Sequence, residues 1–225
     1  MANQSNLLIA GQTYLVYLSN ANCSKGFFDD SCKRYYQTKL LNSLKTYQVK
    51  LHSFTILDNE VFLLGTPFSP TGFTALVNYL NRAYTEYYNS RFERNIASWN
   101  GQTKTSLVQG YQLVLDCQKY IERSCLQENR LGNPGMYEFS SHCLNCFGGK
   151  SNYMIYHPAF SELIANTANP FLSYREFVAT PFPHAYQMYL DKKLKHGQPL
   201  AKREKPMAIP IATKKRCPST VPSYM

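Results

Sequence analysis

The stretch Trp99–Tyr120, WNGQTKTSLVQGYQLVLDCQKY, says more about the fold than any other part of the chain. Its first half places a polar turn after the tryptophan and then β-forming residues at 105–109, which predicts a short strand. Its second half predicts a helix from Tyr111 to about Arg123. The strand and the helix together present Tyr120 near the end of the helix.

The residues before this stretch predict the other elements of a split β-α-β fold. In chain order they are a strand at Thr13–Ser19, a helix from Asp30 or Ser31 to about Tyr47, strands at Val49–Leu57 and Glu60–Gly65, and a helix from Ser69 or Thr71 to about Arg91. The order β-α-β-β-α-β-α is that of an α+β, ferredoxin-like fold with an antiparallel sheet and helices on one face. Residues 1–130 are the predicted core of the domain.

The residues after the core predict a mostly helical and loop-rich extension of the same domain, over 131–205. The expected order is a loop-rich Gly132–Gly149, then short helices at His157–Ala165, Ser173–Val178 and Ala185–Leu194. Prolines, lysines and small residues dominate the remainder, so 206–225 is expected to be a disordered tail.

The composition favours a folded domain in a reducing compartment. The 225 residues are 44% apolar and 14% aromatic, which argues against a disordered chain. No run reaches the roughly 18 apolar residues of a membrane helix, and the N-terminus lacks the basic and apolar regions of a secretory signal. The seven cysteines are scattered, which is typical of reduced thiols. A cytoplasmic protein without a membrane partner is predicted.

Positive charge accumulates near the C-terminus. The net charge is +10, and Lys192–Arg216 holds seven Lys and two Arg against one Glu, a net of +8. Such a segment binds phosphates by releasing their counterions; a solubilising tail is the alternative interpretation. The 18 tyrosines favour nucleic acid, because aromatic rings stack on unpaired bases.

Three segments taken together carry a resemblance to a known family: Trp99–Tyr120, Phe54–Leu64 (FTILDNEVFLL) and Phe139–Pro158 (FSSHCLNCFGGKSNYMIYHP). In order and spacing the chain resembles the REP-associated tyrosine transposases, over about Leu7 to Pro206. These are bacterial single-tyrosine, HUH-type transposases that share a ferredoxin-like core and bind and nick single-stranded DNA. The resemblance implies a DNA hairpin with a single-stranded foot as partner, and DNA transposition as the activity of the family.

The catalytic positions implied by the resemblance are largely replaced. Tyr120 matches the nucleophile, whereas the family's His-x-His metal pair falls on Glu60 and Phe62 and its third metal ligand on Ser124. Phenylalanine cannot coordinate a cation, and one carboxylate with a serine hydroxyl is a poor Mg²⁺ site. Cleavage by a tyrosine needs a cation on the phosphate. The prediction is therefore a vestigial Tyr120 with no metal site and no cofactor, and Mg²⁺ or Mn²⁺ is implied only if residual nicking exists.

Binding makes fewer demands than cleavage, because phosphate contacts come from dispersed Lys and Arg side chains. Lys104 remains from a family Gly-Arg-aromatic-Lys motif, and Lys192–Lys205 lies where the family's basic C-terminal segment takes part in binding. The predicted nucleic-acid-binding residues are Lys104, Lys119, Lys192, Lys193, Lys195, Lys202, Arg203 and Lys205.

A second candidate metal site lies in the loop-rich region. His142, Cys143 and Cys146 resemble a metal knuckle, and zinc would want a fourth ligand such as His157. The segment matches an ordinary non-metal stretch of the family, and no second Cys-x-x-Cys exists, so the structural interpretation is favoured. His52 alternates within a predicted strand and is interpreted as a half-buried structural side chain.

Three functions are compatible with these features. The favoured one is a catalytically degenerate transposase-like protein that binds single-stranded or hairpin nucleic acid, with DNA preferred over RNA, and acts by occupancy as a domesticated regulator. The alternative is a protein–protein contact or homodimer role with incidental DNA affinity. The least favoured is an active transposase that nicks single-stranded DNA through Tyr120.

Overall fold

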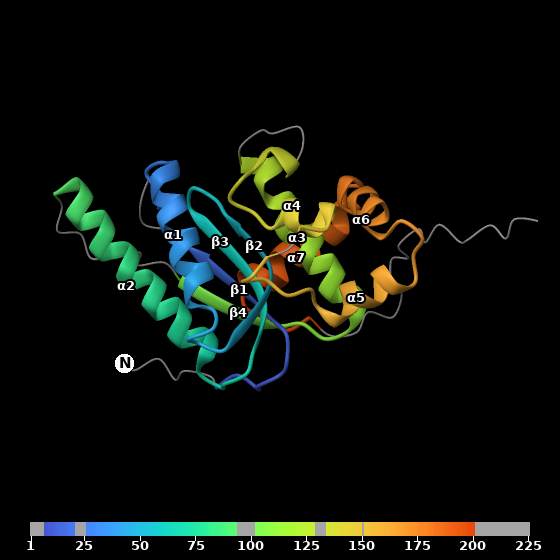
Figure 1. Cartoon of the computed structure of the whole chain (residues 1–225), viewed down its shortest axis with the longest axis horizontal. Helices are drawn as coiled ribbons and strands as arrows, with labels where there is room; N and C mark the ends of the chain where they lie inside the picture. Colours follow the sequence, from blue (N-terminus) through green and yellow to red (C-terminus); the bar gives the residue numbers. More distant parts are fainter. Residues whose placement is uncertain (1–6, 21–25, 94–101, 129–133, 150, 201–225) are drawn as a thin grey trace, which may run out of the picture.

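The computed structural model describes residues 7–20, 26–93, 102–128, 134–149 and 151–200 (Figure 1). The core elements are β1 Tyr14–Ser19, α1 Asp30–Ser43, β2 Val49–Ile56, β3 Glu60–Pro67, α2 Gly72–Phe92, β4 Gln102–Leu107 and α3 Tyr111–Glu128. The extension contains the 3₁₀ turn η1 Pro134–Met136 and the helices α4 His142–Phe147, α5 Pro158–Ala165, α6 Pro170–Ala179 and α7 His184–Lys195.

The four strands form one antiparallel sheet in the order β2-β3-β1-β4, which confirms the predicted α+β, ferredoxin-like core. β1 lies between β3 and β4 and reads YLVYLS, with five of its six residues buried. A strand that is covered on both faces needs apolar residues on both, which is why β1 is apolar throughout and shows no alternation with polar residues.

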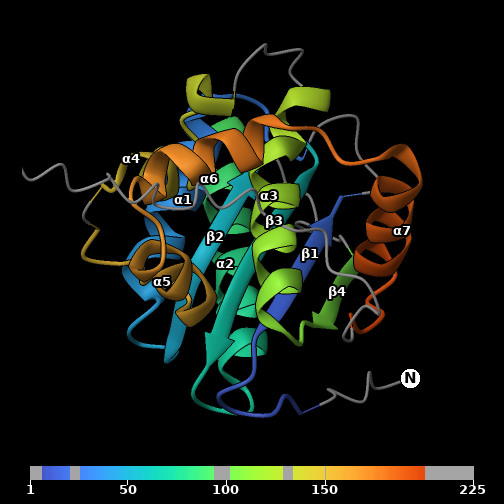
Figure 2. The same cartoon turned by 90° about the vertical axis from the view of Figure 1, so that its right-hand side faces the viewer.

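Helices cover both faces of this sheet. α1 and α2 lie on one face, whereas α3 and the helices of the extension lie on the other (Figures 1 and 2). The sequence predicted helices on one face only. This holds for α1 and α2, whereas α3 and the helices of the extension cover the opposite face (Figures 1 and 2). The second face also needs a cover, because β1 and β3 project the rings of Tyr17 and Phe62 from it and both residues are buried.

The register of the sheet places the candidate site residues on the α3 face. Tyr17 is paired with Phe62 of β3 and with Lys104 of β4, and Ser19 is paired with Glu60. Residues opposite each other in an antiparallel pair share a face, as do residues two apart in one strand. The side chains of Tyr17, Glu60, Phe62 and Lys104 therefore all leave the sheet on the side of α3.

α3 begins after a turn that depends on glycine. Gly110 has φ +102°, a conformation that other residues rarely adopt, and Tyr111 follows as the first helical residue. With the sheet on one side and the extension on the other, α3 is buried almost all round. Its buried polar side chains are those of Asp116, Gln118, Lys119 and Glu122. Buried polar groups need partners, and the partners of several of them define the sites below.

The extension packs against the core through α3, which contacts α5 and α6, and through α7, which contacts β1 and β4. The residue ranges of α5, α6 and α7 agree closely with those of the three helices predicted for the extension. The prediction of a loop-rich Gly132–Gly149 is wrong at α4, a six-residue helix with His142, Asn145 and Cys146 buried on one face. The domain boundary at residue 130 stays a prediction, and the predicted tail 206–225 lies outside the described residues. Within the described ranges, no helix is long and apolar enough to cross a membrane.

Candidate nucleic-acid interface

Glu60, the first residue of β3, is held by two donors. The hydroxyl of Tyr17 donates to its Oε1 at 2.6 Å, and Nζ of Lys195 on α7 donates to the same oxygen at 2.9 Å. The ammonium therefore supplies the positive charge beside this carboxylate. Burial and the hydrogen bond to Glu60 raise the pKa of Tyr17, so its phenol keeps its proton.

Phe62 fills the space next to Glu60 with an apolar ring. It is 1% exposed, and its ring centroid lies 5.1 Å from that of Tyr17 and 5.7 Å from that of Tyr120, edge to face in the second case. These contacts are favourable aromatic geometries. Phe62 presents no atom that can bind a cation.

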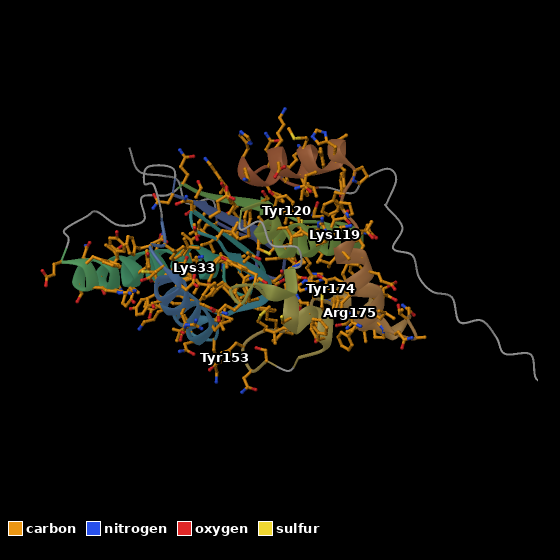
Figure 3. The ribbon with its side chains drawn as sticks, turned by 90° about the horizontal axis from the view of Figure 1, so that it is seen from above. Lys33, Lys119, Tyr120, Tyr153, Tyr174 and Arg175 are labelled. Atoms are coloured by element: carbon orange, nitrogen blue, oxygen red, sulfur yellow. The ribbon has the colours of Figure 1, made fainter. Side chains whose placement is uncertain are left out.

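Tyr120 lies between α3 and α7 (Figure 3) and donates a 2.6 Å hydrogen bond from its hydroxyl to Oδ1 of Asp191. It is 4% exposed. Burial, and after it the hydrogen bond to Asp191, raises the pKa of this phenol well above its usual range, so the phenolate required of a nucleophile is strongly disfavoured.

Ser124, one helical turn after Tyr120, uses its hydroxyl within its own helix, donating to the carbonyl of Ile121 at 2.7 Å. Glu60 is already paired with an ammonium, Phe62 has no donor atom, and the Ser124 hydroxyl is engaged. Oxygen-rich coordination is what Mg²⁺ and Mn²⁺ require. The three positions do not fit a catalytic divalent cation.

These residues nevertheless meet in one place. Glu60, Phe62, Tyr120 and Ser124 all line a pocket of about 590 Å³, together with Lys195 of α7. The other residues at its wall include Arg123, Phe182, His184 and Gln187. The pocket thus brings together every catalytic position that the resemblance implied, with a lysine in addition.

The predicted cationic residues fall into three groups. Lys195 lies in the pocket wall, and Lys104 leaves the sheet on the same face, where its Cβ lies close to Gly197 just after α7. Lys192 and Lys193 belong to the last turn of α7, with Lys192 exposed. Lys202, Arg203 and Lys205 lie outside the described residues.

Lys119 is the exception among the predicted contacts. It is 1% exposed, and its Nζ lies 4.4 Å and 4.3 Å from the ring centroids of Phe177 and Phe182. Desolvation, followed by the charge of Arg123, lowers the pKa of Lys119 to about 8. An ammonium enclosed by two rings has almost no surface to offer a phosphate in this conformation, and the predicted role of Lys119 in binding stays a prediction.

Three partners of the site were not foreseen from the sequence: Tyr17, Arg123 and Asp191. Arg123 donates to the carbonyls of Val178 and Ala179 at 2.6 and 2.8 Å, near the end of α6. One signal for Asp191 existed, because it is the only acidic residue in α7, HAYQMYLDKKLK.

The candidate zinc ligands do not form a knuckle. Sγ of Cys143 is directed toward the carbonyl of Gly135 at 3.4 Å, and His157 lies elsewhere, with its Nε2 2.9 Å from Oγ1 of Thr13. His142 and Cys146 do lie together, and Glu122 of α3 joins them.

His157 and His52 belong to one chain of hydrogen bonds whose direction is set at both ends. The Ala159 amide donates to Nδ1 of His157, and Nδ1 of His52 donates to the carbonyl of Ile155. Each neutral ring has one N–H, so His157 Nε2–H donates to Thr13, Thr13 to Thr66, and Thr66 to Nε2 of His52. His52 is 2% exposed, which makes it structural, as expected, and more deeply buried than predicted.

No protein-family model and no curated protein matches the chain. Among solved structures, the chain is similar to the REP-associated tyrosine transposase bound to a REP hairpin, with a TM-score of 0.54 and 10% sequence identity, over 71% of this chain and 93% of that chain. At this identity the likeness shows the fold, which is a transposase-like fold. Over the matched part, the chain thus shares its fold with a transposase whose structure contains a REP hairpin.

Proposed function

We propose that the chain is a catalytically degenerate relative of the REP-associated tyrosine transposases that binds hairpin or single-stranded DNA and acts by occupying its target, as a domesticated regulator. The observation that carries this proposal is the ion pair between Glu60 and Lys195. It lies where the resemblance implies a metal pair, and it supplies a fixed cation in place of an exchangeable one.

The chemistry of the pocket argues against nicking. A tyrosine nucleophile needs a phenolate aligned with a phosphate whose charge is neutralised by a cation. The Tyr120 hydroxyl is instead committed to Asp191, and the ring of Phe62 lies against it. Both features stabilise a neutral, buried phenol.

The cations favour binding. Lys195 lies in the pocket wall, Lys104 lies on β4 with its side chain on the same face of the sheet, and Lys192 is exposed on α7, on a chain with a net charge of +10. Dispersed lysines bind phosphates without a metal, and their affinity falls with salt. The transposase with the similar fold is bound to a REP hairpin, which supports a hairpin as the ligand.

The test uses the full chain and a labelled DNA hairpin with a single-stranded 5′ foot, compared with a random duplex of equal length. Anisotropy over a salt series measures affinity, and a denaturing gel with Mg²⁺ or Mn²⁺ detects covalent adducts. We expect binding to the hairpin that exceeds duplex binding and persists at moderate salt, without an adduct.

Weak binding that is equal for both DNAs and disappears with salt supports the alternative, a protein-contact role or homodimer with incidental affinity. A metal-dependent covalent band that is lost in Tyr120→Phe overturns the degenerate assignment and restores an active transposase.

A further inference from the structure

A second cluster, away from the pocket, has the composition of a transition-metal site. Glu122 of α3 and His142 and Cys146 of α4 bring a carboxylate oxygen, an imidazole nitrogen and a thiol within 4.8 Å of one another. Glu122 and Cys146 have no exposed surface, and His142 is 5% exposed. Glu122 follows Tyr120 by two residues on one helix, so the two side chains project on nearly opposite sides and the cluster is separate from the pocket.

The ligand atoms have the spacing of one coordination sphere. Nδ1 of His142 lies 3.2 Å from Oε2 of Glu122 and 3.3 Å from Sγ of Cys146. Around tetrahedral zinc, with bonds of about 2.0 Å to N and O and about 2.3 Å to S, neighbouring ligand atoms lie roughly 3.3–3.6 Å apart. His142 and Cys146 are four residues apart, which places both on one face of α4.

The surroundings of Glu122 orient its carboxylate. Nδ2 of Asn145 donates to Oε1 at 2.6 Å, and the hydroxyl of Ser141 lies 3.3 Å from the same oxygen. Oε2 is the oxygen directed toward His142. Hydrogen bonds of this kind fix the rotamer of metal ligands and leave one atom for the ion.

The hydroxyl oxygen of Tyr174 on α6 is the candidate for a fourth ligand (Figure 3). This hydroxyl is buried, lacks a well-aligned hydrogen bond among the described residues, and interacts with the side chain of Glu122. The interactions of this phenol with Glu122 and Cys146 place the hydroxyl beside the cluster. A buried hydroxyl without a well-aligned partner is unfavourable, and a cation in the cluster would satisfy its oxygen.

We propose that Glu122, His142 and Cys146 bind a structural Zn²⁺ ion, with the Tyr174 hydroxyl completing a closed site. Two anionic ligands, the carboxylate and a thiolate, balance the charge of the ion, and a water-free interior tolerates only a neutral cluster. The mixture of nitrogen, sulfur and oxygen donors selects zinc over Mg²⁺ or Ca²⁺. The ion joins α3, α4 and α6, and thereby fastens the extension to the core.

The test measures metal in the full chain, independently of DNA. Protein purified without chelators is analysed by elemental mass spectrometry, and chelator-stripped protein is titrated with zinc while thermal unfolding is followed. We expect about one zinc ion per chain and a higher melting temperature with zinc. Cobalt in place of zinc should give a thiolate-to-metal charge-transfer absorption, which Cys146→Ser abolishes and the matched control Cys143→Ser retains, because Cys143 is exposed.

Stripped wild-type protein that takes up no zinc refutes the proposal and leaves a hydrogen-bonded cluster only; this outcome does not depend on whether a variant folds. Zinc uptake that survives Cys146→Ser, or a charge-transfer absorption that is lost in Cys143→Ser, also overturns it, because the ion would then lie elsewhere.

Discussion

The hydroxyl of Tyr120 and Oδ1 of Asp191 are joined by a 2.6 Å hydrogen bond between α3 and α7, across 71 residues of sequence. The tyrosine that the resemblance marks as a nucleophile therefore serves as a buried donor. Its carboxylate partner favours the protonated phenol, whereas catalysis requires the phenolate.

Tyr120→Phe tests this interpretation. We expect the free energy of unfolding to fall by about 1–2 kcal/mol, because the carboxylate of Asp191 loses a donor in a partly buried place. Urea unfolding measures the change, and hairpin affinity should stay unchanged. The matched control is Tyr153→Phe, since Tyr153 is 47% exposed (Figure 3). Equal stability of the Tyr120 and Tyr153 variants contradicts a stabilising role for the hydrogen bond.

Lys195→Gln removes the lysine cation from the pocket wall. We expect weaker hairpin binding and a slope of log affinity against log salt that is smaller by about 1, because one phosphate contact is lost. The control is Lys45→Gln, an exposed lysine after α1, which covers the other face of the sheet. Anisotropy titrations over a salt series compare the two. An equal loss in both variants indicates that net charge alone is responsible.

Glu60→Gln should act in the opposite direction. The change frees the Lys195 ammonium for phosphate and removes a negative charge from the pocket wall, so hairpin affinity should rise by about 1 kcal/mol, roughly fivefold. Glu138→Gln makes the same charge change outside the pocket, on an exposed residue paired with Arg34. Should the two variants bind alike, the ion pair does not limit access to Lys195.

The two buried histidines predict acid sensitivity. Burial lowers the pKa of His52 and of His157 to about 4, against 6.5 in the unfolded chain. As the pH falls, the unfolded chain takes up protons first, so this contribution is complete above about pH 6.5 and is lost between 6.5 and 4, by up to roughly 3 kcal/mol for each ring.

Urea unfolding at pH 7 and pH 5 measures this loss. His157→Gln should flatten the dependence on pH, whereas His184→Gln, which alters an exposed histidine, should leave it as in the wild type. A wild-type slope retained in His157→Gln would show that other groups cause the acid sensitivity.

The lowered pKa of Lys119 implies that the stability of the fold changes at high pH. Its pKa of about 8 in the folded state lies below the 10.5 of a lysine in the unfolded chain, so between these values only the unfolded chain keeps the proton. The stability of the wild type should therefore rise relative to Lys119→Met between pH 8 and 10.5, by up to about 3 kcal/mol. Unfolding curves of both proteins at pH 7.5 and pH 10 give the difference, and a constant difference contradicts the assigned burial.

The elements of the fold could be predicted because their patterns are local. The run of β-forming residues in β1 and the helical spacing in α2 are visible within a single window of sequence. α4 escaped prediction because HCLNCF is too short to show a period, and its buried residues are partnered by Glu122 from α3.

The site could be predicted only in part. Glu60, Phe62 and Tyr120 share the pocket, as the resemblance implied. Their partners could not be foreseen, because the hydrogen bonds from Tyr17 and Lys195 to Glu60 span 43 and 135 residues and follow from tertiary packing. For the same reason, the sequence around Lys119 does not indicate that the rings of Phe177 and Phe182 enclose its ammonium.

Asp191 and Lys195 are four residues apart on α7, in the order in which an acid and a base on one helix normally pair with each other. Here each reaches away from its own helix, Asp191 to Tyr120 and Lys195 to Glu60. Undocking of α7 therefore frees the phenol and the carboxylate in a single step, and lets the released helix form its own ion pair. The two contacts therefore both depend on the docking of a single helix, α7.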